Sequence, residues 1–506
     1  MRRRIFVGRT IAIGLIALLV GQMAAQAEPW IDTRDAWLRA DIERLSQAGL
    51  IKVPINTWPL MWGSVMNDLE AVKVKDIPIA MRGSLGRVLS AGKDATRSDD
   101  PHQSVSLSVA TESQTFRHFG DGAREGVEFK VRRNGLTDHM AYNFEVIQSK
   151  DPWDEDTTHH DNSYFGFVVG NWIGLLGNIE KWWGPGWSSS IILSNNARPT
   201  PGLSNNARPT PGFTLHRNYS DPFEWPVLAW LGPWTANLFI SKLDDTRVID
   251  DAKLVGLTVG FRPTASLEIN LRRTAQWGGE GRPQGLKNFI KLVGGVSDNC
   301  WTADCRVTEP GNQLGGFDFS WTTPWLNATL YGQKIGEDEH RGKPAKNARQ
   351  LGIKLPFNTK LIDGMLFVEH DDTATGDPLA RYNVFYNHHI YQTGYRYQGR
   401  AIGASWDNDS KVFSIGTTGY LANGDQVELR YAEGIINRDS FDTALPSKHS
   451  VSLEGGEFKS LSGKWQRTFA WGEAQLQGRY TDNLVETFGR QEDKFRFSAS
   501  VVYRFY

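Results

Sequence analysis

The spacing of hydrophobic residues changes at about residue 102. From there apolar and polar residues alternate, as at Val105, Leu107 and Val109, which places one set of side chains on each face of a β-strand. The last strand of the chain is the clearest case. Its apolar face holds Phe495, Phe497, Ala499, Val501, Tyr503 and Phe505, and its polar face holds Arg496, Ser498, Ser500 and Arg504. A terminal strand of this kind is typical of a membrane β-barrel, in which one face meets lipid and the other a wet lumen.

The same alternation predicts a hairpin in the middle of the chain. Its strands are Leu254–Phe261 and Ser266–Arg272, joined by a short turn at Arg262–Ala265. At ~20–25 residues per strand with its connection, the region from residue 96 to 506 holds roughly 16–20 antiparallel strands, and closure favours an even number. We therefore predict an all-β transmembrane barrel over residues 96–506.

Residues 28–95 have helical spacing instead. Asp32 can cap a helix, with an acid three positions on at Asp35, and Trp37, Leu38, Ile42 and Leu45 then recur at helical spacing. A second helix is predicted from Thr57 to Leu69, with Pro59 in its first turn, and a third from Ile79 to Leu89. Three short helices form a bundle that is small for independent stability, so we expect it to rest on the mouth of the barrel on the periplasmic side.

Residues 1–27 resemble a secretory signal peptide. Three arginines precede an apolar segment from Ile11 to Val20, and Ala25-Gln26-Ala27 forms a small-x-small cleavage site. The apolar segment is shorter than the ~18 residues that a spanning helix needs. We expect an exported protein that begins at Glu28 after cleavage.

The composition is consistent with an exported barrel. The sequence has 51 glycines, 19 tryptophans and 2 cysteines, with a net charge of -1. No basic cluster predicts a nucleic-acid partner, and no cofactor is expected. A mean hydropathy of -0.42 fits a barrel that shows lipid only every second residue. Cys300 and Cys305 predict a disulfide in an oxidising compartment.

Ten residues occur twice in succession. Leu193–Gly202 is followed by an identical Leu203–Gly212. Two prolines and one glycine per copy indicate a loop rather than a strand. The repeat is interpreted either as a duplication tolerated in a loop, which is the reading we favour, or as the doubling of an arginine-bearing recognition element.

Several connections carry unusual local sequences. Trp-Trp-Gly-Pro-Gly stands at Trp182–Gly186, Gln-Trp-Gly-Gly-Glu-Gly-Arg-Pro-Gln at Gln276–Gln284, Pro-Gly-Asn-Gln-Leu at Pro310–Leu314, and Ile-Gly-Glu-Asp-Glu at Ile335–Glu339. Together with Asn-Thr-Trp-Pro-Leu at Asn56–Leu60, and in this order, they resemble the Wzi family of capsule-assembly outer-membrane proteins. The resemblance covers essentially the whole mature chain. It implies about eighteen strands, a helical bundle at the barrel mouth, and a lectin-like role in which exported polysaccharide is held on the cell surface.

The residues in these connections suit a glycan ligand. Indole rings stack on sugar C–H faces, whereas carboxylates and guanidinium groups hydrogen-bond hydroxyls. The candidate platforms are Trp182, Trp183, Trp187 and Trp277. The candidate polar contacts are Glu280, Arg282, Glu337, Asp338 and Glu339, and Arg198, Arg208 and Arg282 could pair with uronic acid carboxylates. The expected partners are capsular or extracellular polysaccharide, outer-membrane lipid and the polysaccharide export machinery.

Other interpretations of these residues stay open. Tryptophans of a barrel often form the lipid interface, and charged residues often line a wet lumen. Glu337, Asp338 and Glu339 could bind Ca²⁺, although no metal is expected. His388 and His389 are adjacent and on a strand would face opposite ways, so they do not form a simple ligand pair. Glu280 with Glu337 or Asp338 could in principle hydrolyse a glycosidic bond, but the sequence does not give their separation, and we expect no enzyme. The alternative functions are a porin-type channel for sugars or small solutes and a surface protein without a ligand.

Overall fold

The computed structural model describes residues 28–72, 77–96, 102–150, 152–199, 212–294, 309, 311–340, 343–375, 381–438, 449–482 and 494–505. The predicted signal peptide, Arg208, and the Cys300–Cys305 pair lie outside these residues. The domain boundaries predicted at residues 27 and 95 therefore fall at or beside undescribed segments.

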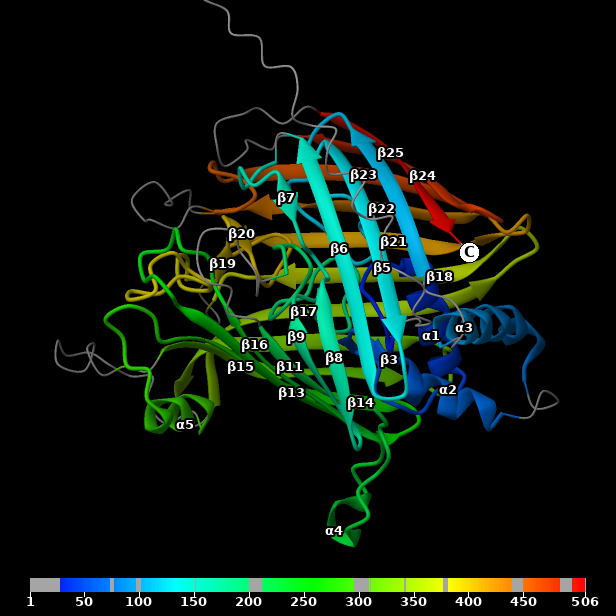
Figure 1. Ribbon diagram of the computed structural model, residues 1–506, viewed down its shortest axis with the longest axis horizontal. Coiled ribbons are helices and arrows are strands. Elements are labelled where there is room, and N and C mark those ends of the chain that lie inside the picture. The colour runs from blue at the N-terminus through cyan, green and yellow to red at the C-terminus, as the bar shows by residue number, and fades with distance from the viewer. Residues whose placement is uncertain are drawn as a thin grey trace, which may run out of the picture.

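The architecture is a closed antiparallel barrel of 18 strands, as predicted (Figure 1). A short additional strand, β7, pairs with β6 alone. The barrel closes where β25 pairs with β4. The strands are β4 (His102–Ala110), β5 (Val127–Leu136), β6 (Met140–Lys150), β7 (Thr158–His159), β8 (Tyr164–Val169), β9 (Trp172–Gly177), β11 (Phe213–Arg217), β12 (Trp234–Lys242), β13 (Lys253–Thr264), β14 (Leu267–Trp277), β15 (Gly311–Thr322), β16 (Thr329–His340), β17 (Lys343–Asn358), β18 (Ile362–Asp372), β21 (Lys411–Leu421), β22 (Gln426–Ile436), β23 (Gly456–Phe469), β24 (Gly472–Asp482) and β25 (Phe495–Phe505).

The alternation predicted for the last strand is confirmed. Phe497 is 59% exposed on the outer face of β25, whereas its neighbour Arg496 is 4% exposed inside the barrel. The predicted hairpin is β13 and β14, with Phe261 opposite Ile269. Its turn lies at residues 265–266 rather than at 262–265, because Thr264 still pairs with Leu267. Arg262 therefore belongs to the strand, and its guanidinium donates to the Ser46 Oγ at 2.6 Å.

The two ends of the barrel differ in their connections. Residues 137–139, 170–171, 265–266 and 359–361 are short turns, and they lie at the same end as the start of β4 and the end of β25; we call this the short-turn end. The other end carries the connections 178–212, 278–310 and 373–410 and is called the long-loop end. This asymmetry is typical of outer-membrane barrels.

The N-terminal region contains the three predicted helices, with altered bounds. They are α1 (Ala36–Gln47), α2 (Trp62–Glu70) and α3 (Arg82–Ala95), the last preceded by a 3-10 turn, η3 (Ile79–Met81). The second helix begins five residues later than predicted, because Thr57–Trp58 and Leu60–Met61 are the short strands β2 and β3. The remaining elements are β1 (Trp30–Ile31), β10 (Trp182–Trp183), β19 (Arg396–Tyr397), β20 (Arg400–Ala401), α4 (Pro226–Ala229) and α5 (Leu286–Gly294).

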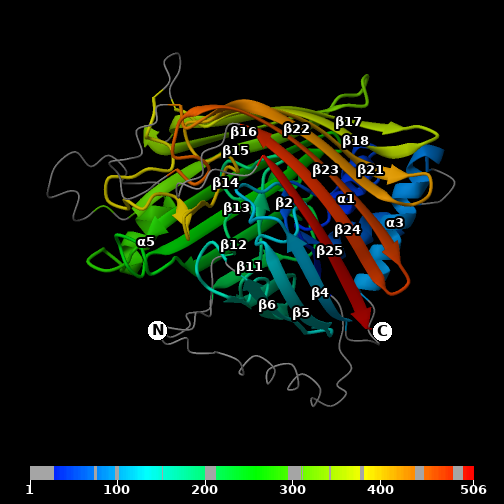
Figure 2. The same ribbon diagram turned by 90° about the horizontal axis from the view of Figure 1, so that it is seen from above.

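Helix α1 lies in the lumen of the barrel, whereas α2 and α3 extend beyond the short-turn end (Figures 1 and 2). The cap of α1 is Asp35 and not the predicted Asp32, because Asp32 accepts the Arg34 backbone N–H at 2.9 Å while Asp35 accepts the Leu38 backbone N–H at 2.8 Å. The Trp37 indole donates to the Val427 carbonyl of β22 at 3.0 Å, and Glu43 accepts from Lys354 of β17 at 2.9 Å. The bundle therefore enters the barrel with one helix instead of resting only on its mouth.

Candidate functional site

The lumen is filled by polypeptide. Residues 112–125, 178–199 and 383–410, which connect strands at the long-loop end, fold inward and are largely buried. We call these three segments together with α1 the plug. Plug residues such as Trp187, Phe119 and Trp182 share one hydrophobic core with α1 and with Phe367 of the wall. The porin alternative requires an open lumen, which this arrangement does not provide.

The Trp182–Trp187 turn lies at the centre of the plug. Trp182 and Trp183 form β10, which pairs with Trp58 and Thr57 of β2. All three indoles of the turn are 0% exposed. A Cβ at Gly186 would lie 2.3 Å from the Ser189 carbonyl oxygen, so the turn closes only with glycine there.

The polar edges of two of these indoles are also occupied. The Trp182 Nε1 donates to the Gly186 carbonyl at 3.0 Å, and the Trp187 Nε1 donates to the Glu43 carboxylate of α1 at 3.1 Å. The Trp187 ring stacks on Phe367 of β18 with ring centroids 5.5 Å apart. In this arrangement the three tryptophans present no face to a ligand, and their geometry favours a structural role.

Arg198 is also committed to the protein. Its guanidinium lies 2.8 Å from each of three carboxylates, those of Glu125, Asp154 and Asp161. Burial opposes the charge of Arg198, but these carboxylates outweigh it and hold the pKa of Arg198 above its ordinary value. The Arg198 guanidinium thus links three segments of the loop region, and its ion pairs leave it poorly placed to bind a uronic acid carboxylate.

Trp277, Glu280 and Arg282 lie together at the long-loop end and are accessible. Trp277 ends β14 and is half-buried, Glu280 is exposed, and Arg282 is partly exposed. The Trp277 ring packs edge-on against Phe289 of α5 at 5.1 Å. The Arg282 guanidinium donates to the Glu309 carbonyl at 2.7 Å. We call Trp277, Glu280 and Arg282 the accessible triad.

A tyrosine from a neighbouring loop holds this turn in place. The Tyr391 hydroxyl donates to the Gly278 carbonyl at 3.0 Å. Burial raises the pKa of Tyr391 to about 12, so the hydroxyl keeps its proton at neutral pH. Gly278 has φ +65°, a conformation that other residues rarely adopt. The accessible triad is therefore presented on a fixed turn.

The acidic sequence at Glu337–Glu339 lies in a strand and not in a connection. All three residues belong to β16, and the Glu337 side chain is 4% exposed. Asp338 and Glu339 pair through the backbone with Ala345 and Pro344 of β17. Their side chains lie outside the described residues, so their predicted binding role stays a prediction.

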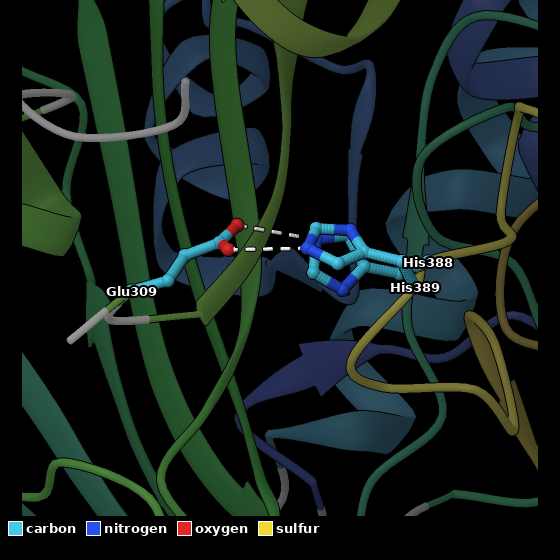
Figure 3. Close-up of side chains that lie close together, drawn as sticks. All are labelled: Glu309, His388 and His389. Carbon is cyan, nitrogen blue, oxygen red and sulfur yellow. Dashed lines mark ion pairs between the residues drawn. The ribbon is translucent and has the colours of Figure 1, made fainter. Parts of the chain in front are cut away.

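Glu309, His388 and His389 form a cluster at the long-loop end (Figure 3). The Glu309 Oε1 lies 3.3 Å from His388 Nε2, and its Oε2 lies 3.4 Å from His389 Nε2. The expectation that the two histidines face opposite ways holds for a strand; they lie in an irregular loop, and both rings turn to the same carboxylate.

The other nitrogen of His388 decides the chemistry of this cluster. The His388 Nδ1 accepts the backbone N–H groups of Ile390 and Tyr391 at 3.2 and 3.3 Å. The proton of a neutral ring then resides on Nε2, where it points to Glu309. A metal ion at Nε2 would have to displace that proton, so the cluster serves better as a polar tie between two loops than as a metal site.

A polar cavity of about 300 Å³ lies in the lumen beside α1. Its wall comes from the lumenal faces of β4, β5, β24 and β25, with Ser106 and Ser500 among the lining residues, and Arg124 and Glu180 of the plug bound it. Arg124 donates to Glu180 at 2.8 Å, which ties the plug together at this boundary. Sequence reasoning missed this cavity, although the small polar residues on one face of β4 and β25 were a signal for it.

The fold and this interior define a class of protein, an outer-membrane-type β-barrel whose lumen is closed by its own loops and by an N-terminal helix. Among the described residues, no helix is long and apolar enough to span a membrane. A sequence profile of the family described as capsule assembly protein Wzi matches residues 97–491. The chain belongs to this family, and it is an outer-membrane protein.

Two relatives are similar over most of their length. An uncharacterized 55.8 kDa protein in the cps region of Klebsiella pneumoniae is 29% identical over 463 residues, which cover 88% of this chain and 84% of the relative. The solved structure of Wzi from Escherichia coli, an outer-membrane protein involved in group 1 capsule assembly and described as a carbohydrate-binding β-barrel, superposes with a TM-score of 0.79. Its sequence is 23% identical, and the match covers 94% of this chain and 99% of that structure.

Proposed function

We propose that this protein binds exported capsular or extracellular polysaccharide on its outer face and retains it at the cell surface. The observation that carries the proposal is the combination of a filled lumen with the accessible triad at the long-loop end. A barrel closed in this way is poorly suited to diffusion. Its loops remain available for a polymer that is too large to enter.

The orientation follows from the connections. Outer-membrane barrels keep short turns in the periplasm and longer loops outside. The short-turn end, with α2 and α3, then faces the periplasm, and the accessible triad faces the exterior. This places the triad where exported polymer arrives, and membership of a capsule-assembly family supports the same role.

The chemistry of the triad suits an acidic glycan. Trp277 offers part of an indole face, Glu280 can accept from hydroxyl groups, and Arg282 can donate to hydroxyls or to a uronic acid carboxylate. The buried Trp182–Trp187 turn supports this surface from beneath by anchoring the plug to α1. We assign the triad to binding and the turn to support, and we assign no catalytic step to either.

The test compares cell-bound and shed polysaccharide in strains that carry different forms of the gene. Deletion should leave total polymer unchanged and move it into the medium. Complementation with Trp277→Ala, Glu280→Ala and Arg282→Ala combined should restore the barrel but not retention. Trp325→Ala is a matched control, since Trp325 is 70% exposed at the opposite end.

Three results would contradict the proposal. Polymer that stays on cells of the deletion strain would exclude retention as the function in that host. Full retention by the triple variant would exclude the triad as the binding surface. Steady conductance of the purified barrel in planar bilayers would favour the channel alternative, because a stable plug should keep it closed.

A further inference from the structure

A protruding segment at the short-turn end has no role in the plug or in the proposed binding surface. Residues 218–233 connect β11 to β12, and they project from the rim of the barrel and carry α4 at their tip (Figure 1). Trp225, Val227 and Trp230 are 62%, 60% and 68% exposed. No residue from 221 to 235 is buried. Two indoles and a valine side chain are thus exposed, away from the rest of the protein.

The base of this segment is fixed. The Trp234 backbone N–H donates to the Ser220 carbonyl at 3.2 Å, and the Arg262 N–H donates to the Pro233 carbonyl at 2.9 Å. Gly232 has φ +69°, and a Cβ there would lie 2.1 Å from the Arg262 carbonyl oxygen. The segment therefore leaves the rim by a defined turn, which we call the α4 arm (residues 220–233).

The α4 arm continues the lipid-facing surface of the barrel. Phe223 stacks on Trp234 with ring centroids 4.6 Å apart and planes 5° apart, and Trp234 contacts Trp172 at 6.5 Å. Asn237 is buried inside the barrel, so Trp234, an odd number of positions away on β12, points outward. The aromatic contacts thus run from the outer wall onto the arm.

We infer that the α4 arm inserts Trp225, Val227 and Trp230 into the lipid headgroup region of the periplasmic leaflet and fastens the rim of the barrel to the membrane surface. Indole rings favour this region because one edge is polar and the face is apolar. The base of the arm contacts α2, where the Ser220 backbone N–H donates to the Ser64 Oγ at 3.0 Å, but the tip that carries α4 projects away from α2 and α3 (Figure 1). Because the tip projects in this direction and the aromatic surface of the arm is continuous with the outer wall of the barrel, we expect lipid to contact the exposed side chains of the arm.

The test places an environment-sensitive fluorescent amino acid at position 227 of the full-length protein, reconstituted in vesicles of phosphatidylethanolamine and phosphatidylglycerol. A second protein carries the same probe at position 79. Ile79 is a matched control, since it is an aliphatic residue, 81% exposed, at the same end of the barrel. Lipids with a nitroxide at headgroup depth report contact, and heat-modifiable mobility on gels confirms that both barrels have assembled.

The expected result is quenching at position 227 at least about twofold stronger than at position 79, with blue-shifted emission at position 227 only. Equal, weak quenching and water-like emission at both positions would overturn the inference and leave the arm for a protein partner. Energy transfer between labelled copies that rises with the protein-to-lipid ratio, without quenching, would also overturn it and indicate a second copy. Neither readout depends on polysaccharide binding.

Discussion

Glu369 of β18 holds the backbone of Trp187 from inside the barrel wall. Its carboxylate accepts the N–H groups of Trp187 and Ser188, the latter at 2.8 Å, and the Tyr331 hydroxyl donates to the same carboxylate at 2.7 Å. The Trp187 ring meanwhile packs on Phe367, two residues away on the same strand. One wall strand thereby fixes both the backbone and the ring of the central plug turn.

Replacement of the Glu369 carboxylate should destabilise the plug without unfolding the barrel. In Glu369→Ala, buried donors lose their acceptor, at about 1–3 kcal/mol for each unsatisfied group. We expect more frequent ion-conducting openings in planar bilayers than for the natural protein, and a smaller effect for Glu369→Gln. Ser500→Ala is the control, because Ser500 also faces the lumen, where it lines the polar cavity. A closed Glu369→Ala barrel would show that other contacts suffice to hold the plug.

Replacement of a buried tryptophan and replacement of an accessible one should have different effects on thermal stability and on glycan binding. Trp183→Ala removes a fully buried indole, at a cost of about 3–5 kcal/mol, and should lower the temperature at which the barrel loses its compact gel mobility. Trp277→Ala should leave that temperature nearly unchanged and weaken glycan binding, measured by retention of polymer on immobilised protein. If Trp183→Ala weakened binding at unchanged thermal stability, the buried turn would have to open to the ligand.

The barrel was predictable because its signal is local. Alternation along β25 and along the β13–β14 pair follows from lipid on one side and a polar interior on the other, and the exposures of Phe497 and Arg496 reproduce it. An acidic cap before α1 was also predictable, because capping depends on neighbouring residues, although the cap is Asp35 and not the predicted Asp32. The predicted start of α2 was wrong, because β2 is held in an extended conformation by pairing with β10, which lies more than a hundred residues away in the sequence.

The interior could not be predicted in the same way. Whether Trp182 faces a ligand or a helix depends on which distant segments fill the lumen, and the sequence alone does not encode that packing in a local pattern. Arg198 illustrates the same limit, because its three carboxylate partners come from two other connections. Aromatic and charged residues in long connections were sufficient to select candidate residues but could not distinguish binding from support.

Arg198→Ala should destabilise the loop region in a pH-dependent manner. In the natural protein, burial opposes the charge of Asp161 and Glu125, but Arg198 outweighs it and holds the pKa of both carboxyls below its ordinary value. Their stabilising contribution is present above the unfolded-state pKa and is lost as the pH falls through the lower folded-state pKa. Without Arg198, the folded-state pKa of both carboxyls should rise, and the part of the stabilising contribution that Arg198 supplies is lost.

The difference in thermal stability between Arg198→Ala and the natural protein should therefore be largest above the ordinary pKa values of the two carboxyls, 3.8 and 4.5, and shrink as the pH falls below them. Gel mobility after heating at each pH measures it. Arg198→Lys, which keeps the charge but cannot reach three carboxylates with a planar fork, should fall between the two. A difference that does not change with pH would indicate lost packing rather than lost charge.

Deletion of one copy of the repeat should preserve the barrel. The two copies are identical, so removal of Leu203–Gly212 leaves a chain that still carries the residues of the first copy. In that copy Ser194 and Asn196 bond to the loop that contains Gly403 and Ala401. Heat-modifiable mobility of the deletion variant is the measurement. Its loss would show that the second copy, of which only Gly212 is among the described residues, has a structural role.

Cys300 and Cys305 should be joined in the exported protein. Four residues separate them, and a protein exported to an oxidising compartment favours the disulfide over two free thiols. Mass spectrometry of unreduced peptides should find the two cysteines linked, and two free thiols would contradict the prediction. A disulfide that closes so short a loop constrains the unfolded chain only modestly. Cys300→Ser combined with Cys305→Ser should therefore leave the heat-modifiable mobility of the barrel unchanged. A lost or shifted transition in that variant would mean that the linked loop also supports the strands it connects.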